Sequence, residues 1–169
     1  NTLNATFCGV NASNVQGINL INQISGFSDA ENSQTKALAY TLIALDSNAY
    51  TVPDNSVLTR ETLRQHLMKR QLENGSFQML DEKDNALETT ALALTALSGY
   101  SSDDNTQSAL KKGVEYLQNM QSGNQRRSAF LDESCNTVSQ IITALNSLKI
   151  NVNDSRFINN RKSLDQILL

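Results

Sequence analysis

Residues 69–97 read KRQLENGSFQMLDEKDNALETTALALTAL, and they describe a unit that recurs along the chain. The first helix of the unit ends at Asn74-Gly75, two residue types that tolerate the positive φ found just beyond a helix C-terminus. A polar loop follows. Residues 85–98 are then apolar almost all the way round a helix, and a helix of that kind is usually buried on every side. The stretch therefore predicts a surface helix, a loop and a buried helix in series.

The rest of the chain repeats these two kinds of helix in alternation. Strongly apolar helices are predicted over residues 33–46, 85–98 and 136–148. Amphipathic surface helices are predicted over residues 57–71, 105–121 and 154–168, from apolar side chains spaced three or four residues apart. A weaker helix is predicted over residues 14–25, and residues 1–13 are interpreted as a loop or a docked extension.

The spacing of the three apolar helices gives a repeat of about 50 residues, which is typical of stacked helical hairpins. We therefore predict an all-α fold in which αα-hairpins place buried helices in an inner layer and amphipathic helices in an outer layer. The predicted domain covers residues 14–169 and follows an N-terminal extension, residues 1–13.

Composition excludes several classes of function. The 169 residues are enough for one domain with a core, and 39% hydrophobic and 18% charged residues are typical of globular proteins. The net charge of −3 argues against a nucleic-acid partner, which would require a basic surface. No apolar stretch approaches the roughly 20 residues of a transmembrane helix.

The segment Gln71-Leu72-Glu73-Asn74-Gly75-Ser76-Phe77 resembles the Q-x-x-x-G-x-W/F repeat of squalene and hopene cyclases, with Phe77 in place of Trp. Residues 30–169 resemble the α/α-toroid repeats of the terpenoid cyclase and protein prenyltransferase superfamily. The resemblance implies that Gly75 lets the chain turn, that Gln71 bonds the backbone at the start of the next helix, and that Phe77 packs against that helix. Gln121 and Phe130 take the matching places in a second loop.

Residues 136–169 resemble more closely a group of uncharacterised Gram-positive surface proteins with prenyltransferase-like repeats. The resemblance implies about three hairpins, which is only part of a toroid. An incomplete toroid would expose apolar helix faces, and such faces usually mark an interface. We therefore expect a non-catalytic module, exported to the surface of a Gram-positive-type bacterium, for binding or structural interaction.

The expected binding surface is the concave side, lined by the N-terminal ends of the inner helices. Its partner would be a small apolar ligand or a protein, and self-association or a neighbouring domain of a larger chain would cover the open ends. Two alternatives remain open. One is a small-ligand carrier resembling half of a transcobalamin-like toroid, and the other is a degenerate cyclase or prenyltransferase.

The cyclase alternative depends on Glu88. Class II terpene cyclases carry D-x-D-D-T-A at the start of an inner helix, and the matching stretch here is ALETTA, residues 86–91. Glu88 keeps the acid position, but the flanking carboxylates are replaced by Ala86 and Thr89. Without those partners Glu88 is only a weak catalytic candidate. Its simpler role is that of an acid at the positive end of a helix.

No cofactor or metal site is predicted. Prenyltransferases bind zinc through Asp, Cys and His, but His66 is the one histidine and belongs to a charged surface helix. Cys135 lies near Asp132 and Glu133 in the sequence. A buried or disulfide-bonded cysteine is a simpler interpretation than a metal ligand. The basic pairs Lys69-Arg70 and Arg126-Arg127 could hold a diphosphate, but solvated loop charges are the favoured explanation.

The two cysteines, Cys8 and Cys135, are too few for a disulfide scaffold. They are either two free thiols or one long-range disulfide, and a disulfide would fit an exported protein. A complement-type thioester is excluded, because Cys8-Gly9-Val10-Asn11 lacks the Glu and Gln of that motif.

Overall fold

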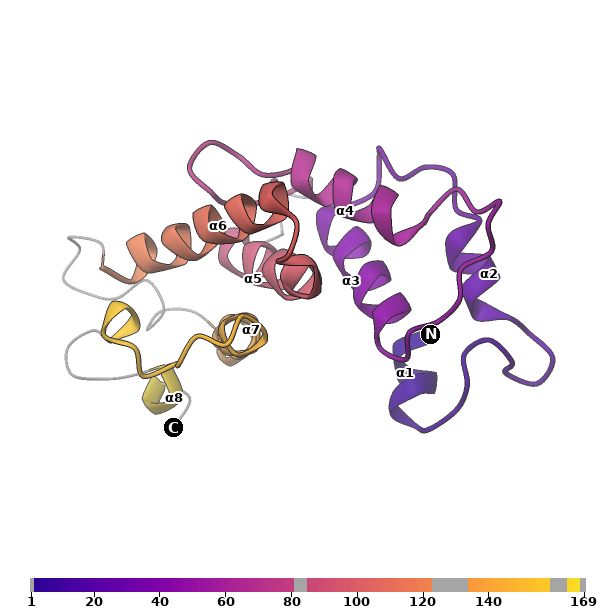
Figure 1. The fold of residues 1–169 in the computed structure, drawn as a ribbon. Helices are drawn as coiled ribbons and strands as arrows, with labels where there is room; N and C mark the ends of the chain where they lie inside the picture. Colours follow the sequence, from indigo (N-terminus) through magenta and orange to yellow (C-terminus); the bar gives the residue numbers. More distant parts are fainter. Residues whose placement is uncertain (1, 81–84, 123–133, 159–163, 168–169) are drawn as a thin grey trace. The chain divides into compact units, whose positions relative to one another are not determined.

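A computed structural model describes residues 2–80, 85–122, 134–158 and 164–167, and this part of the chain is helical with no strand (Figure 1). The all-α prediction is confirmed. The chain divides into two compact units, Asn1–Lys69 (unit 1) and Arg70–Leu169 (unit 2). The helices are α1 Thr2–Phe7, α2 Leu20–Ser25, α3 Thr35–Asp46, α4 Arg60–Lys69, α5 Ala86–Leu97, α6 Asp104–Ser122, α7 Cys135–Ser147 and α8 Leu164–Ile167, with 3-10 turns η1 Ser98–Tyr100 and η3 Ser155–Phe157.

In unit 1, α3 packs against α4. Leu63 and Leu67 of α4 lie one turn apart on the same face, and both are fully buried. The start of α4 is tied to the end of α3 by Arg60, whose Nε lies 2.6 Å from Asp46 Oδ1 and whose Nη2 donates to the carbonyl of Leu45. The helix pair thereby forms the core of this unit.

The N-terminal segment differs from the interpretation of residues 1–13 as a loop, because Thr2–Phe7 forms α1. The segment packs against the rest of unit 1, where Ala12 is fully buried. No sequence pattern indicates this helix, since its six residues are too short to show an apolar period.

The helix predicted over residues 14–25 begins only at Leu20. Gln16 and Gly17 both have positive φ, at 51° and 85°, and reverse the chain in a tight turn. Two backbone hydrogen bonds between Val15 and Ile18 close this turn. The three-residue spacing of Val15 and Ile18 suggested one helical face, but the turn places these residues opposite each other instead.

Unit 2 is built around α5, which packs against both α6 and α7. Nine of its twelve residues are buried, as the all-round apolar pattern predicts. The close approach of α6 depends on Gly113, where a Cβ would lie only 2.6 Å from Leu94 Cδ2. The buried positions of α5 are Leu87, Thr89, Thr90, Ala91, Leu92, Ala93, Leu94, Ala96 and Leu97.

The other two helices predicted as buried on all sides, α3 and α7, are buried on one face only. In α3, Tyr40 is 42% exposed, and in α7, Asn136, Ser139 and Thr143 are exposed. An apolar sequence makes all-round burial favourable, but the number of packed neighbours decides whether it occurs. Among the described elements α5 has such neighbours on two sides.

The amphipathic helix predicted over residues 154–168 is shorter in the described part of the chain. Asp154 accepts a hydrogen bond from the backbone N–H of Arg156 and starts the 3-10 turn η3. Ile158 then takes an extended backbone conformation, with φ −93° and ψ 123°, so the helix does not continue through it. A separate short helix, α8, follows at Leu164–Ile167.

Candidate functional site

The motif loop of residues 71–77 is a structural joint of unit 2. The side-chain amide of Gln71 donates to the carbonyl of Gly75 at 3.1 Å and to that of Ala109 in α6 at 2.8 Å. Phe77 is buried, and its backbone N–H donates to Thr90 Oγ1 in α5 at 3.0 Å. The loop therefore bridges α5 and α6. The resemblance implied that Gln71 would bond the backbone at the start of α5. Its amide instead reaches the second turn of α6.

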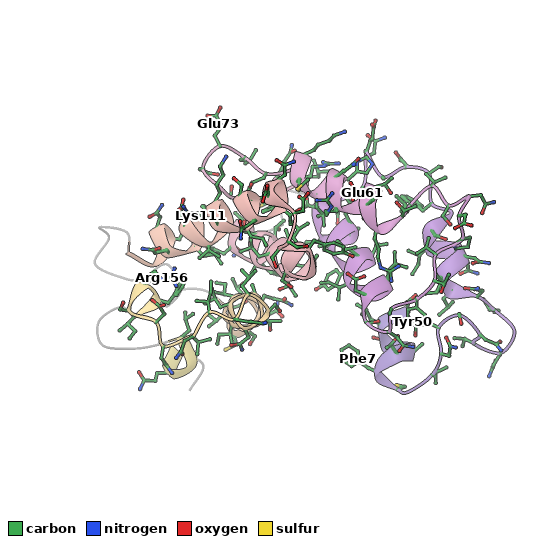
Figure 2. All side chains as sticks on the ribbon, viewed as in Figure 1. Phe7, Tyr50, Glu61, Glu73, Lys111 and Arg156 are labelled. Carbon is green, nitrogen blue, oxygen red and sulfur yellow. The ribbon has the colours of Figure 1, made fainter. Side chains whose placement is uncertain are left out.

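Gly75 is the residue at which this loop touches α6 most closely. Its φ is +89°, and a Cβ built on it would lie 2.8 Å from the carbonyl carbon of Lys112 and closer still to the carbonyl oxygen. A side chain at this position would therefore be strained and would also collide with the backbone of α6. Glu73 lies at the exposed tip of the same loop (Figure 2).

Glu88 lies at the start of α5 and is half-buried. Its backbone N–H donates to the side-chain oxygen of Asn85, the residue that caps α5. Thr90, from the stretch that matches the cyclase motif, is committed to the hydrogen bond from Phe77. The residues around Glu88 thus shape the helix start, and its neighbours Ala86 and Thr89 supply no second carboxylate.

The second motif loop was predicted from Gln121 and Phe130. Gln121 belongs to α6, but its side chain and the whole of Phe130 lie outside the described residues. The same holds for Arg126, Arg127 and the Asp132-Glu133 pair.

Cys8 and Cys135 are both exposed free thiols in the structure. Since they belong to different units, their pairing stays a prediction. In the described part of the chain, no group of three or more His, Cys, Asp or Glu side chains is arranged to hold a metal ion.

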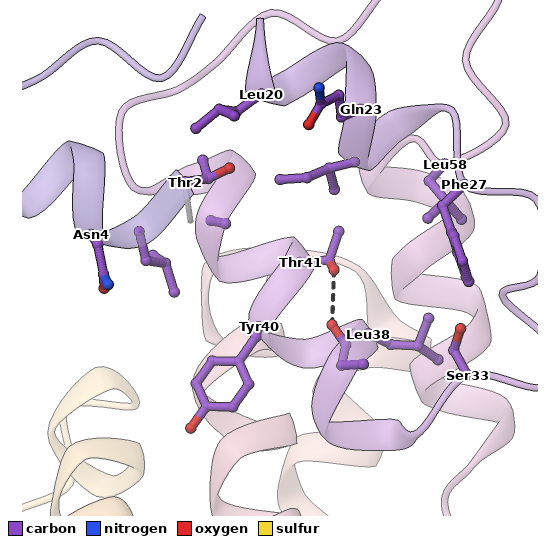
Figure 3. A pocket seen from close by; sticks show the side chains of 14 residues that line it. Thr2, Asn4, Leu20, Gln23, Phe27, Ser33, Leu38, Tyr40, Thr41 and Leu58 are labelled. Carbon is purple, nitrogen blue, oxygen red and sulfur yellow. Dashed lines mark hydrogen bonds between the residues drawn. The ribbon is translucent and has the colours of Figure 1, made fainter. Parts of the chain in front are cut away.

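Unit 1 contains an open groove of about 790 Å³ (Figure 3). Its floor is one side of α3, and its walls are α1, α2 and the segment before α4. Among the described residues, the lining contains no Asp, Glu, Lys, Arg, His or Cys. The lining residues are Thr2, Leu3, Asn4, Leu20, Gln23, Ile24, Phe27, Ser33, Ala37, Leu38, Tyr40, Thr41, Ala44 and Leu58.

The wall formed by α1 is held in place by Tyr50, a buried residue that follows α3 (Figure 2). The Tyr50 hydroxyl lies 2.8 Å from Thr6 Oγ1 and accepts a hydrogen bond from the buried backbone N–H of Ala12 at 3.1 Å. The Thr6 hydroxyl first, and then the Ala12 N–H, lower the pKa of Tyr50 from its ordinary value. One side chain thus bonds both the last turn of α1 and the segment that follows it.

A smaller hollow of about 350 Å³ in unit 2 is lined partly by α6 and includes Lys111 and Arg156. Arg156 is already engaged, because its Nε and Nη2 each lie 2.9 Å from a carboxylate oxygen of Asp154. These bonds lower the pKa of Asp154 to about 2. The guanidinium also lies over the ring of Phe157, 5.8 Å from its centroid. The engaged guanidinium makes this hollow a weaker candidate for a ligand site than the groove of unit 1.

The chain matches no family model, no curated protein and no solved structure. Across the described ranges, the structure contains no helix that is both long enough and apolar enough to cross a bilayer.

Sequence reasoning missed the groove of unit 1. The expected site was at the N-terminal ends of the inner helices. Ala37 and Leu38, near the start of α3, do line the groove, but the first turns of α5 and α7 line neither hollow. A partial signal was present in Leu20, Ile24 and Phe27, which are spaced as one helical stripe and which all line the groove. The docking of α1, which supplies a wall, has no such signal.

Proposed function

We propose that this chain is a non-catalytic binding module whose groove in unit 1 takes a small apolar ligand. The observation that carries the proposal is the lining of that groove, which is concave and mostly apolar, with a few polar side chains. Ligand sites in proteins usually have this composition and a volume of about 300–1,000 Å³.

The same lining argues against catalysis in the groove. General acid–base and nucleophilic steps need a titratable or activated group within hydrogen-bond reach of the reacting atom. Among the described residues of the lining, Tyr40 alone has an ionisable side chain, a phenol. Glu88, the weak catalytic candidate, does not line this groove.

The resemblance to α/α-toroid repeats and to Gram-positive surface proteins supports two further parts of the proposal. The first is that the helices form hairpins of a partial toroid, with a second copy or a neighbouring domain covering its open ends. The second is that the module is exported to the bacterial surface. A small-ligand carrier is the form of the proposal that the groove favours, since its lining offers shape and apolar contact without reactive groups.

Fluorescence titration with diphenylhexatriene, a hydrocarbon probe that brightens in apolar sites, tests the proposed function. The variant Thr41→Arg places a long cation on the floor of the groove and should weaken probe binding about tenfold or more, because the charge must be desolvated or must displace the probe. Thr41 Oγ1 donates only to the Ala37 carbonyl one turn earlier, so the substitution removes no tertiary hydrogen bond.

Thr143→Arg is the matched control. Thr143 is an exposed residue of α7 that makes the same bond, from its Oγ1 to the Ser139 carbonyl at 2.8 Å, but it does not line the groove. The control variant should bind the probe as the unchanged chain does. If both variants bound the probe equally, the probe would not occupy the groove, and the groove would be the wrong site. If the unchanged chain bound no probe, the proposed function itself would be contradicted.

A further inference from the structure

We infer that the ligand of the unit 1 groove is a small neutral amphiphile, with a hydrocarbon chain of medium length and one hydroxyl or amide group. This inference rests on the proposed function and adds the chemical class of the ligand. It follows from where the exposed Phe27 ring and the unpaired polar side chains lie along the groove (Figure 3). Ser33 lies on the same side of the view as Phe27, but its hydroxyl already donates to the Asp29 carbonyl.

The apolar end of the groove lies where α2 ends. Phe27 is 51% exposed there, beside Leu58, and Figure 3 shows both on the same side of the view. The backbone N–H of Leu58 donates to the Ser25 carbonyl at 2.9 Å, which fixes the segment before α4 to the end of α2. An exposed aromatic ring on a fixed apolar wall gains free energy when a hydrocarbon chain covers it.

The polar end lies at α1, where Figure 3 places Asn4 and Tyr40 away from Phe27. Both side chains are exposed, and neither makes a hydrogen bond to another described residue. An amide offers a donor and an acceptor, and so does a phenol hydroxyl. Together they can satisfy a small ligand group that also both donates and accepts.

The absence of charge from the lining argues against an ionic head group. A carboxylate or phosphate is usually bound by Arg or Lys through charge-assisted hydrogen bonds, and an ammonium group by carboxylates. Neither kind of side chain occurs in the part of the lining that the structure describes. A hydroxyl or an amide gains its hydrogen bonds here without a counter-charge.

The length of the groove floor indicates the length of the ligand's hydrocarbon chain. Ala37 and Ala44 both line it and lie two turns apart on α3, which is about 10 Å at 1.5 Å per residue. That length suits a chain of medium size, so decan-1-ol is a fitting probe.

The test measures the affinities of decan-1-ol and diphenylhexatriene for the full chain and three variants, below the aggregation limit of each probe. Asn4→Ala should weaken binding of decan-1-ol about threefold to tenfold through the lost hydrogen bond, and should leave diphenylhexatriene unchanged. Phe27→Ser should weaken both probes, because both use the apolar end. Asn153→Ala, at an exposed residue of unit 2, is the control and should change neither.

Decanoate and decyltrimethylammonium complete the series and should bind more weakly than decan-1-ol. Tighter binding of either ion would overturn the neutral class, and so would an equal loss of both probes in Asn4→Ala. Those results leave diphenylhexatriene binding by the unchanged chain intact, and with it the proposed function. A chain that binds no probe at all would overturn both proposals.

Discussion

Gly75 is the residue on which the joint between the motif loop and α6 most clearly depends. Gly75→Ala should lower the free energy of unfolding by about 1–3 kcal/mol, since the backbone has φ +89° and the new Cβ would meet the Lys112 carbonyl. The clash is with backbone, which cannot rotate away as a flexible side chain could. Chemical denaturation followed by circular dichroism measures the effect.

Gly99→Ala provides the matched control within the same unit. Gly99 lies in the 3-10 turn η1, and a Cβ there would have no atom within 4 Å. The control should leave stability unchanged or raise it by about 0.4–1 kcal/mol, because alanine restricts the unfolded chain. If the two variants were equally stable, the close approach of the loop to α6 would be wrong.

The residues of the motif loop also show how far a sequence pattern reaches. The resemblance implied that Gln71, Gly75 and Phe77 act together at a turn. In the structure, Gln71 bonds α6 and Phe77 bonds α5. The partner of Gln71 could not be predicted, because Ala109 is 38 residues away and any backbone carbonyl can accept. Such a choice depends on how α6 packs.

Among the helices, α1 is the element whose position matters most for the groove. Tyr50→Phe removes the oxygen that accepts the buried N–H of Ala12 and that bonds Thr6. A buried donor left without a partner costs about 1–3 kcal/mol. We expect unit 1 to lose about that much stability, and we expect faster hydrogen exchange at the Ala12 amide.

The affinity of the groove for diphenylhexatriene should fall in the same variant, because α1 forms one of the walls. Tyr40→Phe is the control for stability alone, because Tyr40 itself lines the groove; its hydroxyl is exposed and makes no hydrogen bond to another described residue. It should change stability by less than about 0.5 kcal/mol. Unchanged exchange at Ala12 in Tyr50→Phe would contradict the role given to the tyrosine hydroxyl.

Helix prediction succeeded best where the apolar pattern was long. The predicted helix over residues 85–98 matches α5 closely, and residues 105–121 match α6. It failed for α1, which is short, and for residues 14–19, where a turn competes with a helix at the same apolar spacing. Local patterns of three or four residues are compatible with both conformations.

At the scale of the whole molecule, the two cysteines report on whether units 1 and 2 are covalently linked. Because Cys8 and Cys135 are exposed free thiols in the structure, the native chain should react with two equivalents of Ellman's reagent without reductant or denaturant. Each cysteine replaced by serine should remove one equivalent. Reaction that appears only after reduction would instead show the long-range disulfide.

The order of apolar and polar residues was enough to predict an all-α chain, the strongly apolar α5 and the amphipathic α6, because helical periodicity is a local property. It was not enough to predict the turn at Gln16-Gly17 or the one-sided burial of α3. The order of residues also did not predict the groove, because its lining comes from α1, α2 and α3 together. Of these helices, α1 is held by a hydrogen bond that joins Thr6 to Tyr50, 44 residues later in the sequence. Contacts between distant segments depend on which surfaces meet when the chain packs, and a local pattern does not contain that information.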